Sequence, residues 1–358
     1  MVCSIPSRTR IQLIWLDAVL ILIAIMVIIG GTTRLTGSGL SMTDWKLIGE
    51  MIPPLNEAAW EEKFRLYQGT PQHVIVNAHM TVEEFKGIFW WEYIHRMWGR
   101  LLGLAFGIPF AYFALAGWLD KRRIKLMFIA LLLGAAQGLW GWFMVQSGLV
   151  DRPWVSPVRL TGHLLLALFL FGFVWWNRLE IQALSKPTDV GVRPLWPQGI
   201  PRWAGWIVLA LVIQFALGGV MAGLRAAMDY PTYPTMNGQW IPAGLWKPEM
   251  GWHNLVENSA WVHFLHRGWG LIVLLGVTAW AWFCGRRLPL ALARMYGLLA
   301  AATWVQFALG VVTVLSSRGS IPVSWGVMHQ FGSVVLTLLM VMIWFYERKG
   351  VVNSHQVS

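Results

Sequence analysis

The chain has 358 residues, of which 56% are hydrophobic and only 13% are charged, and it contains 25 tryptophans. This composition leaves too little polar surface to cover a water-soluble body of that size, so it excludes an ordinary soluble protein and predicts a membrane protein. The formal net charge of +11 comes from basic residues that gather on one side of the predicted membrane topology. It therefore does not indicate a nucleic-acid partner.

Eight apolar segments are long enough to cross a hydrocarbon core of roughly 30 Å as helices. In chain order they cover about residues 12–31, 88–118, 126–146, 159–176, 203–224, 260–283, 293–315 and 323–346. Such long runs without two-residue alternation indicate helices, because only helices and closed barrels satisfy their backbone groups in lipid. The predicted fold class is an all-α integral membrane protein with eight transmembrane helices, arranged as two pseudo-symmetric four-helix bundles.

Basic residues gather in the segments that share one side of the membrane when eight helices are counted. They include Arg8, Arg10, Lys121, Arg122, Arg123, Lys125, Arg286, Arg287, Arg348 and Lys349. The opposite side carries two long loops, about 32–87 and 225–259, with most of the acidic residues. The positive-inside rule then predicts cytoplasmic termini. No cleavage site follows the first apolar run and no Arg-rich transit segment precedes it, which favours a bacterial plasma membrane.

The segment around His95 recurs around His266, 171 residues later (266 − 95). The same alignment matches Arg96 with Arg267, Trp98 with Trp269 and Gly99 with Gly270. Other residues also correspond between the two segments of the repeat. Gly30-Gly31, expected to end the first helix, corresponds to Gly218-Gly219, and Gln137 corresponds to Gln306. The repeat predicts an N-terminal half, 1–185, and a C-terminal half, 200–358. Four helices separate equivalent positions, so the halves are expected to be parallel repeats about an axis along the membrane normal.

Each half contains a second histidine within an apolar segment: His163 follows His95 by 68 residues (163 − 95), and His329 follows His266 by 63 (329 − 266). All four are expected at one depth, about four to seven residues into their helices. Two matched pairs predict two bis-histidine haem sites, because each haem needs one imidazole on each face. For any single histidine, helix packing is the alternative. Zinc is a weaker alternative because cysteines and carboxylates are scarce at this depth.

Charged residues beside these histidines suggest roles for the two sites. Arg96 and Arg267 lie near the polar boundary, where their guanidinium groups are candidates for binding haem propionates; snorkelling is the alternative. Glu92 lies one turn before His95, and His263 occupies the equivalent position in the second half. This difference predicts that the first site performs a reaction while the second holds a resident cofactor. A simple hydrogen-bonding role is the alternative for Glu92, and helix packing for His263.

Three motifs in this order carry a resemblance to a known family: GGTTRLTGSGLS over 30–41, EYIHRMWGR over 92–100 and HFLHR over 263–267. With them the chain resembles haem A synthase over nearly its whole length. The resemblance implies an oxidoreductase that converts the C8 methyl group of haem O to the formyl group of haem A, with water as the oxygen source, for haem-copper oxidases. It also implies that His266 and His329 ligate a resident haem b. His95 and His163 would hold haem O beside a catalytic Glu92.

Some members of that family carry a cysteine pair in an outer loop, whereas Cys3 and Cys284 here are both expected at the cytoplasmic edge. The chain is therefore similar to the cysteine-free branch, which includes mitochondrial and alphaproteobacterial enzymes. The implied partners are haem O, haem O synthase, oxidase assembly factors and membrane lipid, with no nucleic acid. Two other functions stay open: a diheme b-type electron-transfer subunit and a non-catalytic haem carrier. The difference between Glu92 and His263 favours the enzyme over both.

Overall fold

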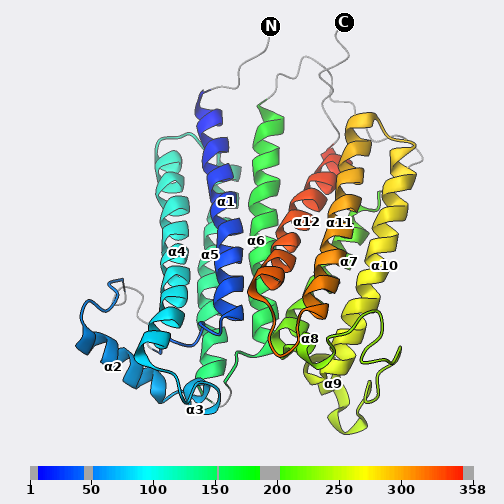
Figure 1. Cartoon of the computed structure of the whole chain (residues 1–358). Coiled ribbons are helices and arrows are strands. Elements are labelled where there is room, and N and C mark those ends of the chain that lie inside the picture. Colours follow the sequence, from blue (N-terminus) through cyan, green and yellow to red (C-terminus); the bar gives the residue numbers. More distant parts are fainter. Residues whose placement is uncertain (1–6, 44–50, 151–152, 186–201, 350–358) are drawn as a thin grey trace, which may run out of the picture.

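The computed structural model describes residues 7–43, 51–150, 153–185 and 202–349. Within these ranges the protein is a bundle of helices (Figure 1), with one isolated β-bridge between Met236 and Gln239. Eight helices are long and apolar enough to cross a membrane, which confirms the predicted all-α class with eight transmembrane helices. They are α1 (Ser7–Leu35), α4 (Val82–Leu115), α5 (Lys121–Leu149), α6 (Pro157–Leu184), α7 (Ala204–Leu224), α10 (Ser259–Gly285), α11 (Leu290–Leu315) and α12 (Val323–Lys349).

Short helices occupy the two long loops that hydropathy had left without secondary structure. In the first loop are α2 (Glu57–Gln68) and α3 (Pro71–Ile75). The second loop contains α8 (Ala226–Asp229), the 3-10 helix η1 (Pro248–His253) and α9 (Asn254–Glu257). All five lie at one end of the bundle, which we call the loop end (Figure 1). Their residues are too polar or too few to give a transmembrane pattern, so hydropathy could not detect them.

Several predicted helix boundaries differ from the structure, and two of them bear on the histidines. Helix α4 begins six residues earlier than expected (88 − 82), because Thr81 and Glu84 form a capping box in which each side chain accepts a hydrogen bond from the backbone N–H of the other. His95 therefore lies 13 residues into its helix (95 − 82), further than the other three histidines. Helix α1 continues through Gly30-Gly31 to Leu35, as it must within lipid, where a broken helix would leave backbone groups unsatisfied.

Buried apolar side chains form a separate large cluster in each half of the chain. The first lies mainly among α1, α4, α5 and α6 and includes Leu16, Phe110 and Phe171. The second joins α7, α10, α11 and α12 and includes Leu211 and Leu299. A third, smaller cluster packs α2 against the start of α4. Each group of four helices thus has its own apolar core.

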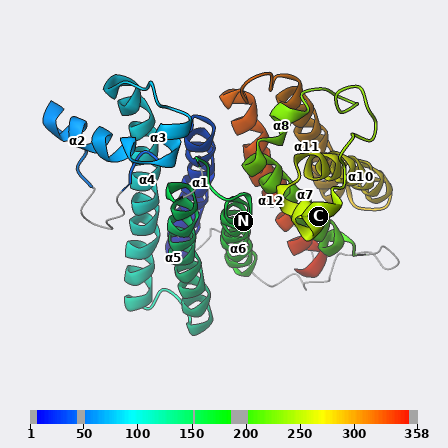
Figure 2. The same ribbon diagram turned by 90° about the horizontal axis from the view of Figure 1, so that it is seen from below.

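The two groups meet along α1, α6, α7 and α12 (Figure 2). Helix α7 approaches α6 through two glycines four residues apart. A Cβ atom at Gly219 would lie 2.8 Å from the Thr161 Oγ1, and one at Gly223 would lie 2.5 Å from the Pro157 Cα. Small residues at this spacing let membrane helices come close enough for backbone-to-backbone packing. The contact between the halves therefore depends on these two positions having no side chain.

Replacing Gly223 by Ala should destabilise this contact, because the new methyl group would collide with the backbone of Pro157. Overpacking of this kind typically costs about 1–3 kcal/mol. We expect a lower midpoint of thermal unfolding for the purified protein in detergent. The matched control is Gly276→Ala on α10, where a Cβ atom has no neighbour within 4 Å; equal midpoints for the two variants would contradict the assignment.

Candidate functional site

Each of the four predicted histidines lies against a glycine on a neighbouring helix. A Cβ atom built on the glycine would come within about 3 Å of the imidazole in every case. The pairs are Gly30 with His95 (3.2 Å to Nε2), Gly141 with His163 (3.0 Å to Cε1), Gly218 with His266 (3.0 Å to Cε1) and Gly310 with His329 (2.9 Å to Cε1). Because interiors are close-packed, a larger residue would push the ring aside. The four glycines therefore create the space that the four rings occupy.

In the second half the two imidazole rings face each other. The ring centroids of His266 and His329 are 6.4 Å apart and the ring planes are perpendicular. His329 Nδ1 lies 3.1 Å from the backbone carbonyl of Gln306, to which it can donate, and His266 Nδ1 lies 3.2 Å from the side-chain amide of Gln214. A contact at Nδ1 fixes the orientation of an imidazole. For His329, whose Nδ1–H donates to a carbonyl, it also leaves Nε2 as the nitrogen for a ligand.

A cavity of about 210 Å³ is lined by both of these histidines. Its walls come mainly from α7, α10, α11 and α12, with Arg34 from α1 and Leu164 from α6 among the other lining residues, and no carboxylate is among the described residues that line it. Metal–imidazole bonds are about 2 Å long, so the separation of the two rings leaves room for one metal ion between them. Two imidazoles beside an apolar cavity are residues that would hold a haem iron.

The first half repeats only part of this arrangement. Gln137 donates to the backbone carbonyl of His163 (3.0 Å), as Gln306 does to that of His329 (2.8 Å). In the described residues, however, the rings of His95 and His163 make no mutual contact of the kind seen in the second half. The position equivalent to Gln214 is Met26, since Gly30 and Gly218 are 188 residues apart (218 − 30; 214 − 188). The first pair therefore has fewer polar neighbours.

The seam between α4 and α5 is more open than the corresponding seam between α10 and α11. A Cβ atom at Gly103, Gly107, Gly134 or Gly138 would meet nothing within 4 Å. The repeat places Leu274, Thr278, Thr303 and Phe307 at the equivalent positions (103 + 171, 107 + 171, 134 + 169, 138 + 169).

Side chains close the second seam. Leu274 and Thr303 are buried, and Trp304 Nε1 donates to the Thr278 hydroxyl across the seam (3.1 Å). Trp280 and Tyr296 add an edge-to-face aromatic contact, with centroids 4.6 Å apart. The first half is thus open to the side at a place where the second half is sealed.

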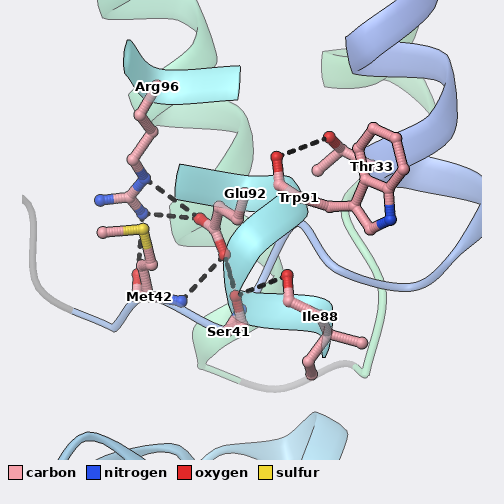
Figure 3. Close-up of polar contacts among 7 residues, drawn as sticks. All are labelled: Thr33, Ser41, Met42, Ile88, Trp91, Glu92 and Arg96. Carbon is pink, nitrogen blue, oxygen red and sulfur yellow. Dashed lines mark hydrogen bonds and ion pairs between the residues drawn. The ribbon is translucent and has the colours of Figure 1, made fainter. Parts of the chain in front are cut away.

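Glu92 is buried and accepts hydrogen bonds from five donors (Figure 3). Its Oε2 accepts from the backbone N–H of Ser41 (2.7 Å), the Ser41 hydroxyl (2.7 Å) and the backbone N–H of Met42 (2.8 Å). Its Oε1 accepts from Arg96 Nη2 (2.7 Å) and Nε (3.2 Å). Five donors and no acceptor fit an ionised carboxylate. This carboxylate ties the segment 36–43 to α4.

Arg96 completes the same clamp, because its Nη2 also donates to the backbone carbonyl of Met42 (2.8 Å). The second half has an equivalent clamp built with an imidazole. Arg267 Nε donates to His263 Nε2 (2.9 Å), and its Nη2 donates to the Tyr230 carbonyl (2.9 Å). Both arginines that the sequence suggested as propionate contacts therefore hold loop-end segments of the protein. Their contact with propionates stays a prediction.

Sequence reasoning identified the residues of this region but not their partners. The structure brings His266 together with His329, as the repeat suggested, and it pairs Glu92 with Arg96, which the sequence analysis had not proposed. It also adds Ser41, Met42 and Gln214, which sequence reasoning had not selected. Ser41 ends the GGTTRLTGSGLS motif, which was the one available indication that this segment contacts the site.

This set of features defines a class: a polytopic membrane protein with two histidine pairs near one end of its helices. Residues 13–341 match the COX15-CtaA family, described as cytochrome oxidase assembly protein, and the chain belongs to that family. It is 40% identical over 334 residues to the heme A synthase of Parvibaculum lavamentivorans, covering 93% of each chain. It is also similar to the heme A synthases of Paramagnetospirillum magneticum (42% over 337 residues, 91% and 90% of the chains) and Maricaulis maris (40% over 348 residues, 96% and 98%).

The Glu92 clamp predicts a measurable change in amide exchange. In Glu92→Gln a single uncharged oxygen would remain for five donors, and the NH2 group would face donors, so the hydrogen bonds from the N–H groups of Ser41 and Met42 should weaken or break. Hydrogen bonds to charged groups contribute about 1.5–3 kcal/mol, so hydrogen–deuterium exchange in a peptide covering 39–43 should rise at least roughly tenfold.

Glu84→Gln is the matched control for this experiment, because Glu84 lies on the same helix and caps its start. It should speed exchange at Thr81 and leave residues 39–43 as they are. Unchanged exchange over 39–43 in Glu92→Gln would show that the carboxylate does not hold this segment.

Proposed function

We propose that the protein is a haem A synthase, which oxidises the C8 methyl group of haem O to the formyl group of haem A for haem-copper oxidases. The observation that carries the proposal is the pair of matched histidine sites that differ in one titratable residue, Glu92 in the first and His263 in the second. Relatives named heme A synthase that match more than 90% of the chain support the same reaction.

In this proposal the C-terminal half, 200–358, holds a resident haem b between His266 and His329. Support comes from the facing rings, the cavity beside them and the sealed seam between α10 and α11. The N-terminal half, 1–185, holds haem O at His95 and His163. A substrate must enter and leave, and the open seam between α4 and α5 favours that role for the first half.

Glu92 is the residue we assign to proton transfer in the first site. The bound haems supply the redox chemistry of the reaction, and removing hydrogens from a methyl group requires a proton acceptor. A carboxylate one turn from His95 has the right position on the helix for that task. Because five donors already surround Glu92, it can accept a proton only if it gives up at least one of them. Movement of the segment 36–43 would therefore accompany the chemistry.

The proposed location is a bacterial plasma membrane with both termini in the cytoplasm, and the loop end on the opposite side. Basic residues at the other end of the bundle support this orientation, among them Arg122 and Arg123 at the start of α5 and Arg348 and Lys349 at the end of α12. Haem O synthase and oxidase assembly factors are the proposed protein partners.

The function is tested by extracting the haems of protein purified from cells that make haem O, and identifying them by mass spectrometry. Haem A, or a partly oxidised haem O, is expected together with haem b. Haem b alone at both sites would instead indicate a diheme electron-transfer subunit, and unmodified haem O would indicate a carrier.

Substitution of single histidines separates the two sites. His329→Ala should abolish the bis-histidine b-type absorption of the purified protein, because it removes one axial ligand of the resident haem. His163→Ala should keep that absorption and stop formation of haem A. Reduced-minus-oxidised spectra and extracted haems report both effects. A full b-type signal in His329→Ala would refute the cofactor assignment.

The proton-transfer role of Glu92 requires a control for its role in the clamp. Glu92→Gln should reduce the yield of haem A per folded protein at least roughly 100-fold, in the usual range for loss of a general acid–base group. Ser41→Ala removes one donor from the same carboxylate but keeps its charge, and its yield should stay within a few-fold of the unmodified protein. Equal losses in both variants would assign Glu92 to the clamp alone.

A further inference from the structure

Arg34 is a charged residue of the first half that reaches into the second. It lies in the last turn of α1, and its Nη1 donates to the backbone carbonyl of Ala222 on α7 (3.1 Å). Its Nε is buried and has no hydrogen-bond partner among the described residues. An ionised side chain with an unused buried donor is costly within a membrane and usually marks a functional site.

Two cavities border this side chain. One is the cavity beside His266 and His329, and the other, of about 60 Å³, is also lined by Arg225 and Trp154. The Arg225 guanidinium lies 3.3 Å from the centre of the Trp154 ring. No Asp or Glu is among the described residues that line either cavity. Arg34 thus lines the same cavity as the histidine pair, Arg225 lines the neighbouring one, and no described carboxylate lines either to neutralise them.

Arg267, the other arginine of the large cavity, is already occupied. Its Nε donates to His263, its Nη1 to the carbonyl of Thr235 (3.2 Å), and its Nη2 to that of Tyr230. Among the described residues, Arg34 donates to the Ala222 carbonyl and keeps an unused Nε. Of the two arginines, Arg34 therefore has the donor available for an anionic ligand.

We propose that Arg34 binds a carboxylate of the ligand held by His266 and His329, which under the proposed function is a propionate of haem b. A guanidinium group can hold a carboxylate through two parallel hydrogen bonds. The first half provides this arginine to the second half, but the second half provides no equivalent one to the first. The reason is that the repeat places Ala222 at the position equivalent to Arg34 (34 + 188). The resident haem is consequently held by both halves, and the substrate haem receives no such arginine in return.

The test compares binding of haem b with binding of its dimethyl ester, in which both propionates are masked. Full-length protein carrying His163→Ala is used, so that absorption titration reports the second pair. We expect the parent protein to bind haem b at least roughly tenfold more tightly than the ester. Adding Arg34→Gln should weaken the binding of haem b by that factor and leave the binding of the ester unchanged. The preference for haem b over the ester should therefore disappear. Arg34→Lys, which keeps the charge, should retain part of it.

Arg159→Gln is the matched control. Arg159 is an arginine near the same end of the bundle that donates to the Phe143 carbonyl (2.7 Å) and lines neither cavity, so the preference should persist. An undiminished preference in Arg34→Gln would overturn this inference and leave the proposed function intact. Failure of the parent protein to bind haem b through His266 and His329 would overturn both.

Discussion

A histidine ring inside a membrane helix needs space beside the helix that carries it, and here one glycine on a neighbouring helix provides that space for each ring. This constraint pairs α1 with α4, α5 with α6, α7 with α10, and α11 with α12. Each ring is confined on its glycine side. In the second half the rings of His266 and His329 lie 6.4 Å apart between centroids. The positions of the four imidazole rings thus follow from helix packing.

The same framework carries two sites of different character because a few equivalent positions differ. Gln214 contacts the His266 ring where Met26 stands in the first half. Leu274, Thr278 and Thr303 fill the second seam where the first half has glycine. A sealed site suits a permanent ligand, and an open one suits a ligand that exchanges. Duplication of four helices followed by changes at the seam is sufficient to produce both.

The sequence was sufficient to predict the eight helices and to select His266 and His329, whose rings lie close together, because hydropathy and a 171-residue repeat can be read from the chain itself. It was not sufficient for the loop end. The early start of α4 depends on the reciprocal cap between Thr81 and Glu84. The partners of Glu92 depend on the approach of the segment 36–43 to a helix about 50 residues away. No periodic pattern records such contacts, so the hydrogen bonds of Arg96 to Glu92 and Met42 were not predicted.

Comparison of the two clamps bears on why a carboxylate stands at position 92. Arg267 holds its loop-end segment with a histidine as its helix partner, so an uncharged imidazole is sufficient for that mechanical task. A buried Glu–Arg pair is costly to desolvate and contributes little net stability compared with less polar alternatives. The clamp by itself therefore does not require Glu92 to be a carboxylate. Glu92 lies in the half with the open seam, and its charge is explained more simply by chemistry on an exchanging ligand. The five donors then keep the carboxylate oriented until that ligand is bound.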